Sequence, residues 1–323
     1  MQGNFSNGYI FIAPYQAPGA GPYIYDKVNG DLVWDGFGVV GGANAHNFHV
    51  CTYQNADHLC MFSGNQQPGY AVGNGIIVDT NYKVVASVQT GNSLTPADQH
   101  EFQLTPDGET ALLTSYQTIP FDLSAPQYGN VTNQQGWLQQ GVFQEVNVTT
   151  GEVLFEWFSS NHVDIRDSRV APKSSDVSGD GYTPHSAWDY FHINAIDKSV
   201  ATGNYLISAR HTHGIYYING TNGDVIWTMG GKDNQFEDKS DGQATNFAWQ
   251  HDARWRNTDL TEMTLFDNGA ADWVKTENET RGLWLSIDYD DMSVTLKQDY
   301  ISPEGILSTV SYTHLTLPTK RIV

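Results

Sequence analysis

One short pattern, a polar turn followed by an apolar strand, recurs five times along this chain of 323 residues. About 50 to 70 residues separate successive copies, which occupy residues 29–34, 80–85, 150–155, 222–227 and 290–295. Three copies carry a Gly-Asp or Gly-Glu pair at the turn, and Asn-Gly is a strong hairpin signal. A unit that repeats at this interval predicts a β-propeller, in which each copy marks one four-stranded blade.

The rest of the chain also predicts an all-β fold, because short β-rich runs bounded by Gly, Asn, Asp and Pro dominate and helical periodicity is nearly absent. We expect one propeller domain over residues 1–309, six-bladed, with one blade incomplete through truncation. A β-sandwich with long insertions is the alternative, but its hairpins would recur at about 8–12 residues. Residues 160–187 are expected to form a long loop. Residues 310–323 match no repeat and are treated as an atypical tail outside the native fold.

The composition restricts the partners. Apolar residues make up 39% of the chain and aromatic residues 12%, which is enough for a core. There are 36 acidic against 16 basic residues, a formal net charge of −20, and such a charge repels nucleic acid and anionic membranes. No apolar run approaches the ~18–20 residues of a membrane span. We therefore expect a small-molecule partner, bound by a local group of positive side chains.

Several features indicate a secreted glycoprotein. Cys51 and Cys60 have a spacing that suits a hairpin cross-link. Lysines are few, and five Asn-x-Ser/Thr sequons are present. They begin at Asn4, Asn130, Asn147, Asn219 and Asn278. The first residues lack the basic start and the apolar run of a signal peptide, so either the chain is a mature fragment or the assignment to secretion is wrong.

Four polar islands carry most of the chemistry, each at the start or end of an expected strand and each in a different repeat. They are residues 98–102, 188–194, 208–213 and 249–254, which include His100, His192, Arg210, His211 and His251. Imidazole can act as nucleophile, base or metal ligand near neutral pH, and arginine binds the oxygens of tetrahedral anions. Strands of a propeller open to a central channel, so we expect these islands to converge on one site.

The islands resemble those of the arylsulfotransferase family, in particular its fungal secreted branch. The resemblance spans roughly residues 8–300 and is most specific between 188 and 269. It rests on Asp-Tyr-Phe-His-Ile-Asn at 189–194, Gly-Asn-Tyr-Leu-Ile-Ser-Ala-Arg-His-Thr at 203–212, Gly-Asp-Val-Ile-Trp-Thr-Met-Gly-Gly at 223–231, Trp-Gln-His-Asp-Ala-Arg at 249–254 and Leu-Phe-Asp-Asn-Gly at 265–269. The family is a six-bladed propeller whose bacterial members move a sulfuryl group between phenols through a sulfated histidine.

Carried over by motif, the resemblance implies a role for each of four residues. His251 is the nucleophile, His192 and Arg210 hold the sulfuryl oxygens, and His100 completes the clamp or handles the phenolic proton. Sulfuryl transfer spreads charge over equatorial oxygens, so positioning and positive groups supply most of the catalysis. Further substrate-binding candidates are His211, Trp188, Tyr190, Trp249 and Arg254, although propeller cores also use tryptophan heavily. No extra N-terminal β-domain of the bacterial kind corresponds to any part of this chain.

Two other functions remain open. The protein could be a propeller without catalytic activity that binds aromatic or carbohydrate ligands in the channel. It could also be a metal hydrolase or lyase, because His211 and His213 are expected on alternate strand positions, where with His192 or His251 they could ligate zinc. His46 and His49 are read as loop residues. We expect no cofactor; Asp176, Ser178 and Asp180 resemble the first half of a calcium loop but lack a downstream bidentate Glu.

Overall fold

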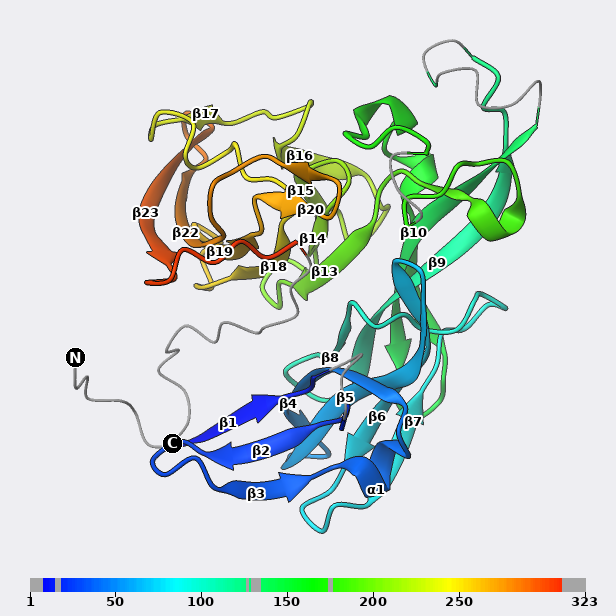
Figure 1. Cartoon of the computed structure of the whole chain (residues 1–323), viewed down its shortest axis with the longest axis vertical. Helices are drawn as coiled ribbons and strands as arrows, with labels where there is room; N and C mark the ends of the chain where they lie inside the picture. The colour runs from blue at the N-terminus through cyan, green and yellow to red at the C-terminus, as the bar shows by residue number, and fades with distance from the viewer. Residues whose placement is uncertain (1–7, 15–18, 126–127, 129–134, 174–176, 310–323) are drawn as a thin grey trace.

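Five large sheets, one after another along the chain and each built on antiparallel strands, make up most of the described structure, and a small two-stranded sheet accompanies them (Figure 1). The structure is a computed structural model, and it describes residues 8–14, 19–125, 128, 135–173 and 177–309. Within these residues the sheets define an all-β propeller with five blades, so the sixth blade that we expected is not found there. The tail at 310–323 lies outside the described residues.

Each blade is a meander in which neighbouring strands follow one another in sequence. Blade 1 is β1 (Tyr9–Ile12), β2 (Tyr23–Asp26) and β3 (Leu32–Asp35); blade 2 is β4 (Asn44–Tyr53), β5 (Ala56–Gln67), β6 (Tyr70–Val78) and β7 (Val84–Val88). Blade 3 is β8 (Phe102–Leu104), β9 (Thr110–Phe121), β10 (Gly136–Asn147) and β11 (Val153–Phe158); blade 4 is β13 (Ile193–Lys198), β14 (Tyr205–Ala209), β15 (Gly214–Ile218) and β16 (Val225–Gly230). Blade 5 is β18 (His251–Trp255), β19 (Glu262–Asp267), β22 (Arg281–Asp288) and β23 (Ser293–Ile301).

Short elements complete the blades. The two-residue strand β12 (Trp188–Asp189) pairs in parallel with β10, β17 (Glu237–Asp238) pairs in parallel with β23, and β20 (Ala270–Ala271) forms a hairpin with β21 (Val274–Lys275). The helical elements whose bounds lie fully within the described residues are short. They are α1 (Phe37–Val40) and three 3-10 turns in or next to the expected loop at 160–187, namely η2 (Ser159–Asn161), η3 (Ile165–Asp167) and η4 (Pro184–Ser186). No described helix has the length and apolarity that crossing a bilayer requires.

The five sequence repeats are the turns that lead into the last strand of each blade, β3, β7, β11, β16 and β23. Two of them share the sequence Asn-Gly-Asp and the same internal bond: the amide of Asn29 donates to Asp31 at 2.8 Å, and that of Asn222 donates to Asp224 at 2.6 Å. The intervening glycines have φ of 76° and 80°, which residues with a side chain rarely adopt. The repeat therefore predicted the propeller fold correctly.

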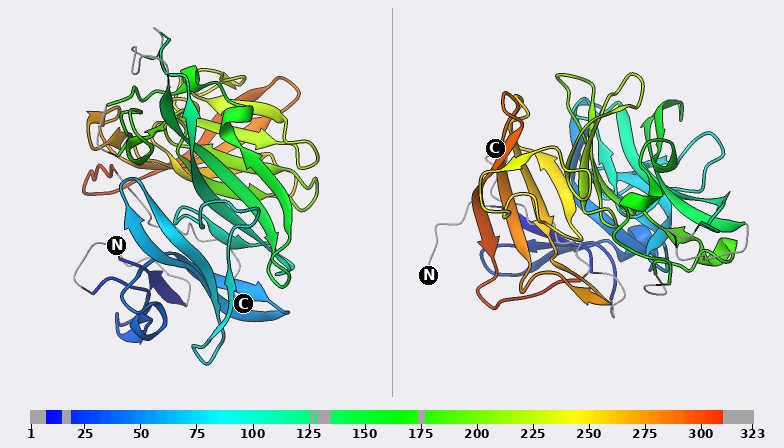
Figure 2. Two further views of the ribbon diagram at one scale, coloured as in Figure 1. Left: turned by 90° about the vertical axis from the view of Figure 1, so that its right-hand side faces the viewer. Right: turned by 90° about the horizontal axis from the view of Figure 1, so that it is seen from above.

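Apolar layers between successive blades form the core. One layer between blades 3 and 4 includes Phe143, Trp157 and Tyr205, and another between blades 4 and 5 includes Trp227 and Leu283. Further layers join blades 1 and 2 and blades 2 and 3. Figure 2 shows successive sheets lying side by side. Burying each such side chain contributes about 1.5–3 kcal/mol, so interleaved blade faces hold the first strands in place.

The expected disulfide is present. Cys51 on β4 and Cys60 on β5 are joined across the first hairpin of blade 2, with their Cα atoms 5.8 Å apart. Of the five sequons, Asn4 and Asn130 lie outside the described residues, and Asn278 is exposed. Asn147, the last residue of β10, and Asn219, which directly follows β15, are partly exposed. Glycosylation of these sites stays a prediction.

Candidate active site

The first strands of the blades bring the histidines together. His100 lies two residues before β8, His192 directly precedes β13, and His251 is the first residue of β18. Strands of neighbouring blades pack together near these residues: β4 contacts β8, β9 contacts β13, and β13 contacts β18. Three residues far apart in sequence therefore meet at neighbouring strand ends.

Arg210, His211 and His213 lie in the turn between β14 and β15, not on a strand. His192 of the second island and Arg210 of the third thus both belong to blade 4, and the expectation that each island comes from a different repeat is wrong. Turn residues do not alternate between two faces as strand residues do. The ring of His213 accordingly packs edge-on against Trp249, with the ring centroids 4.5 Å apart, and does not join the other imidazoles.

Four buried imidazoles form what we call the histidine cluster: His100, His192, His211 and His251. Ring centroids are 4.8 Å apart for His100 and His192, 4.6 Å for His192 and His211, and 6.5 Å for His100 and His251. Sequence reasoning named all four, and the structure brings them into one group with Arg210. Three blades supply the group, so it exists only when those blades are packed together.

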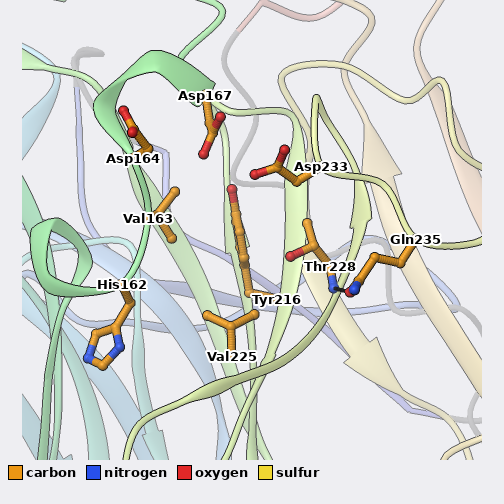
Figure 3. A pocket seen from close by; sticks show the side chains of 9 residues that line it. All are labelled: His162, Val163, Asp164, Asp167, Tyr216, Val225, Thr228, Asp233 and Gln235. Atoms are coloured by element: carbon orange, nitrogen blue, oxygen red, sulfur yellow. Dashed lines mark hydrogen bonds between the residues drawn. The ribbon is translucent and has the colours of Figure 1, made fainter.

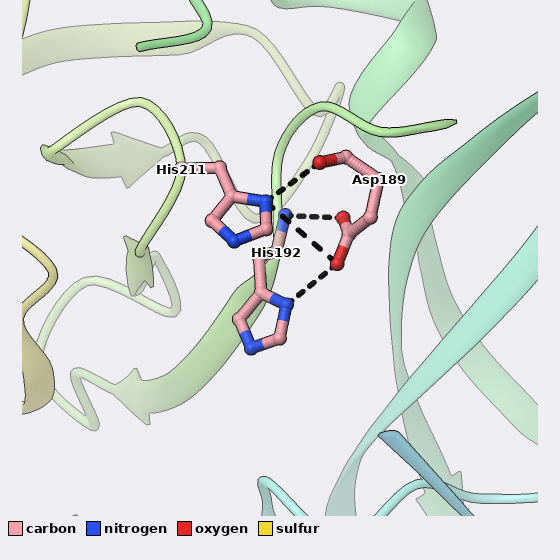
Figure 4. A group of neighbouring side chains, drawn as sticks. All are labelled: Asp189, His192 and His211. Atoms are coloured by element: carbon pink, nitrogen blue, oxygen red, sulfur yellow. Dashed lines mark hydrogen bonds and ion pairs between the residues drawn. The ribbon is translucent and has the colours of Figure 1, made fainter. Parts of the chain in front are cut away.

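Asp189 connects two members of the cluster (Figure 4). Its carboxylate contacts Nδ1 of His192 at 2.6 Å, and its backbone oxygen accepts a hydrogen bond from Nδ1 of His211 at 2.6 Å. A backbone oxygen can only accept, so Nδ1 of His211 carries the hydrogen and Nε2 has a lone pair. That lone pair faces Nη1 of Arg210, 2.9 Å away. One acidic residue therefore orients both rings.

The His192–Asp189 pair can present a donor to a bound anion. Burial raises the pKa of Asp189, and burial, followed by the charges of His100 and Arg210, holds the pKa of His192 well below its ordinary value. Both shifts favour uncharged groups. When the pair holds one shared proton between the carboxyl oxygen and Nδ1, Nε2 of His192 carries a hydrogen whichever group holds the shared one. That nitrogen can then donate a hydrogen bond to an oxygen of a bound anion.

His251 is held in the form that a nucleophile needs. Its Nδ1 lies 2.7 Å from Oδ1 of Asn268, and the amide nitrogen of Asn268 donates to the backbone oxygen of Ser308 at 3.1 Å. The second bond fixes which end of the amide faces the ring, so Nδ1 carries the hydrogen and Nε2 the lone pair. Burial, and then Arg210, lower the pKa of His251 to about 3. The imidazole is therefore neutral at pH 7.

Arg210 supplies the cation of the site. Its guanidinium carbon lies 5.3 Å from the ring centroid of Trp249 and 5.7 Å from that of Trp273, which is the range of a cation–π contact. Its Nη2 also donates to the backbone oxygen of Thr309 at 3.1 Å. The indoles and His211 hold the guanidinium in a defined place, so an anion bound there meets a prearranged positive group.

His100 is paired with a carboxylate of its own. Its Nδ1 lies 2.5 Å from Oδ2 of Asp98. Burial alone would raise the pKa of Asp98, but the adjacent His100 and several hydrogen bonds lower it overall. The carboxylate of Asp98 therefore orients the ring of His100. The ring of Tyr116 lies 5.8 Å from His100 and 5.7 Å from His192, and closes one side of the cluster.

One buried histidine escaped the sequence analysis. His46 and His49 lie on strand β4, not in a loop, and His46 is only 1% exposed. Burial, and then the neighbouring His100, lower the pKa of His46 to about 4. The register shift between His46 and His49 shows why the pattern misled: a bulge in β4 turns His46 inward. No sequence motif marks this position.

Three of the expected substrate-binding residues have packing roles. Trp188 and Tyr190 lie in the apolar layer between blades 3 and 4, where each donates to a backbone oxygen. Arg254 is paired with Glu101 at 2.6 Å and also binds Asp252. The polar groups of all three are therefore engaged within the protein, whereas Trp249 and His211 adjoin Arg210.

The cluster geometry fits hydrogen bonds better than a metal. Among the described residues, one set of three potential ligands lies within 4.8 Å of one another, namely Asp189, His192 and His211. Two ligand atoms of a tetrahedral zinc, each at about 2.0–2.1 Å, stand about 3.3 Å apart. The His192–Asp189 contact of 2.6 Å is shorter, and Nδ1 of His211 uses its hydrogen on a backbone oxygen. Nδ1 of His192 and Nδ1 of His211 are thus both engaged in contacts within the protein.

The segment that resembles half of a calcium loop makes contacts within the protein. Asp176 lies outside the described residues. Ser178 is buried, and Oδ1 of Asp180 accepts hydrogen bonds from the backbone of Tyr182 and from the hydroxyl of Ser186. Asp180 thus organises a turn, and calcium binding here stays untested.

A separate cavity of about 430 Å³ lies between the 3-10 turns and blade 4 (Figure 3). Its lining consists of His162, Val163, Asp164, Asp167, Tyr216, Val225, Thr228, Asp233 and Gln235. Burial, and then Asp233, raise the pKa of Asp167 to about 6. No member of the histidine cluster lines this cavity. Its three carboxyl groups would repel an anionic ester, so the histidine cluster is the better candidate for anion chemistry.

Fold and site together define a β-propeller with buried imidazoles and a guanidinium at the ends of its first strands. Residues 49–323 match the family described as Arylsulfotransferase (ASST), and the chain belongs to this family. Comparison with curated proteins finds no match.

Solved structures with a similar chain path are distant in sequence. A protein of unknown function from Bacteroides caccae is 11% identical, with a TM-score of 0.47, over 91% of this chain and 73% of that one. The β-propeller domain of Cps50 (Swd1) from Myceliophteria thermophila is 9% identical, with a TM-score of 0.44, over 91% of this chain and 68% of that one.

Proposed function

We propose that this protein moves a sulfuryl group from a phenolic sulfate ester to a second phenol, with His251 as the nucleophile. The observation that carries the proposal is the 2.7 Å contact between Nδ1 of the buried His251 and Oδ1 of Asn268, which leaves the lone pair on Nε2. Membership of the arylsulfotransferase family supports the same reaction class. Such a ring can attack sulfur through Nε2 while the guanidinium binds the sulfuryl oxygens.

The first half-reaction breaks the bond between sulfur and the phenolic oxygen. The lone pair on Nε2 of His251 forms the new nitrogen–sulfur bond, and the bonding pair leaves with the phenolate. Arg210 and Nε2–H of His192 stabilise the negative charge on the sulfuryl oxygens. A phenol has a pKa near ~10, as in tyrosine, so the phenolate is a tolerable leaving group.

The second half-reaction returns the enzyme to its starting state. The acceptor phenol attacks sulfur, the nitrogen–sulfur bond breaks, and its electron pair returns to Nε2 of His251. The acceptor gives up one proton and the departed phenolate takes one, so no proton is gained or lost over the cycle. His100, supported by Asp98 at 2.5 Å, is the proposed carrier of that proton.

We also propose an extracellular location, supported by the disulfide between Cys51 and Cys60, because such bonds persist in oxidising compartments. Fungal-type secretion and use of the sequons belong to the same proposal. Mass spectrometry of protein secreted from a eukaryotic host would test both points.

The decisive experiment follows release of the phenol from para-nitrophenyl sulfate, with and without a phenol acceptor. Turnover is expected only with the acceptor, and His251→Ala should abolish it, while the exposed His185→Ala serves as the matched control. Phenol release that needs added metal and no acceptor would indicate a metal hydrolase. Binding of phenols by the wild type without any turnover would indicate a binding protein.

A further inference from the structure

The side chain that faces Nδ1 differs among the histidines of the cluster. His100 and His192 each face a carboxyl group, from Asp98 and Asp189. His251 instead faces the amide oxygen of Asn268. A carboxylate can take a proton from the ring, whereas an amide oxygen accepts a hydrogen bond but does not become protonated near neutral pH. The nucleophile is therefore the ring whose side-chain partner cannot remove its proton.

The amide of Asn268 is firmly placed. The residue is 0% exposed, its Nδ2 donates to the backbone oxygen of Ser308 at 3.1 Å, and its own backbone oxygen accepts from the hydroxyl of Thr280 at 2.9 Å. Thr280 in turn accepts from the backbone of Ser308 at 2.8 Å. Rotation of the amide would bring its NH₂ group against the hydrogen on Nδ1 of His251, so the oxygen stays toward the ring.

This arrangement affects the sulfated ring more than the free one. Once a sulfuryl group is attached to Nε2, the ring carries hydrogen on Nδ1 and a positive charge, balanced by the sulfonate. If Nδ1 keeps that hydrogen, the group that departs in the second half-reaction is neutral imidazole, whose conjugate acid has a pKa near ~6.5. If the hydrogen is lost, the departing group is an imidazolate anion, which is far more basic and leaves slowly.

We propose that Asn268 is a positioning residue that keeps the Nδ1 proton on sulfated His251, so that the sulfuryl group passes readily to the acceptor. This inference rests on the proposed function. No atom or electron pair beyond those already described is required: the nitrogen–sulfur pair returns to Nε2, and the proton on Nδ1 does not move at any step. Asn268 never touches the substrate and acts only through His251.

The test uses Asn268→Asp, which keeps the size of the side chain and adds a group that can take the proton. Rapid mixing with para-nitrophenyl sulfate measures the first half-reaction as a burst of about one phenol per protein, and addition of a phenol acceptor measures the second. The burst rate should change little. The acceptor step should slow by about 10²-fold, and it should recover as the pH falls and the new carboxylate becomes protonated.

Asn257→Asp is the matched control in the same blade, because the Oδ1 of Asn257 also accepts hydrogen bonds, from the backbone of Thr261 and Glu262. In Asn257→Asp, both half-reactions should proceed at their wild-type rates. An Asn268→Asp protein whose two half-reactions slow equally, with no recovery at low pH, would overturn the inference. So would one with an unchanged acceptor step.

A second variant covers the case in which Asn268→Asp does not fold. Asn268→Ala removes the acceptor that fixes the ring hydrogen, so the burst should slow by about 2- to 10-fold, the worth of one hydrogen bond. An unaltered burst would contradict the role of Asn268. If the wild-type protein shows no burst and no sulfated histidine by mass spectrometry, it is the proposed function that fails, and this outcome differs from every result above.

Discussion

The side-chain amide of Asn47 donates a hydrogen bond of 3.0 Å to the backbone oxygen of His100, 53 residues further along the chain. Asn47 forms the bulge in β4 and has a left-handed φ of 53°. The same amide contacts Oε1 of Glu101 at 3.2 Å. A single polar side chain on blade 2 thus fixes the loop that carries His100 on blade 3.

Replacement of Asn47 should therefore destabilise the loop that carries His100. Asn47→Ala removes the bonds to blade 3 and places alanine at a strained φ, so we expect unfolding to become easier by about 1–3 kcal/mol. Asn47→Gly loses the same bonds without the strain and should cost less. Chemical denaturation measures both. Equal losses in the two variants would show that the backbone strain is unimportant.

Arg210→Lys tests the anion clamp. Lysine keeps the charge but cannot bind His211 and stack between two indoles in the same plane, so kcat/KM for an aryl sulfate should fall by about 10²–10³-fold. Steady-state release of phenol checks this, with circular dichroism to show that the variant is folded. A loss below about threefold would place the sulfuryl group away from this guanidinium.

Arg254 should behave differently, although it lies in a similar motif. Its partner Glu101 is buried, and burial raises the pKa of that carboxyl group despite the arginine. Arg254→Ala leaves Glu101 without its main partner, so the free energy of unfolding should drop by about 3–5 kcal/mol. The activity per folded molecule should change far less than in Arg210→Lys. Parallel denaturation and kinetic measurements separate the two roles.

The pKa of His251 predicts how stability and activity respond to acid. Because the folded-state pKa is lowered from 6.5 to about 3, the unfolded chain binds a proton that the folded chain does not between these values. The free energy of unfolding should fall as the pH falls through this window, and His251→Gln should reduce the slope. The burst rate should show no loss from protonation of His251 between about pH 5 and 8. A burst that titrates near 6.5 would mean that the ring is solvated.

Local signals explain what could be predicted from the sequence. The Asn-Gly-Asp turns at 29–31 and 222–224 act through short-range geometry, so each last strand of a blade was recognisable. Cys51 and Cys60 lie on one hairpin, and their pairing was predictable for the same reason. His100, His192, His211, Arg210 and His251 were recognised because each lies in a polar island of an otherwise strand-like chain.

Long-range packing explains what could not be predicted. His46 faces the cluster because of a bulge in β4, which no local sequence pattern predicts. Trp273 contacts Arg210 only because the hairpin of β20 and β21 folds back. Trp188 and Arg254 resembled ligand-binding residues, yet the blades use them for packing and ion pairing. Which polar side chains face the site and which join blades depends on contacts between distant segments.

Three separate blades supply His100, Arg210 and His251 to the candidate site. No single sheet contains enough of the machinery to act alone. Turnover measured during refolding would therefore begin only when the three sheets have packed against one another.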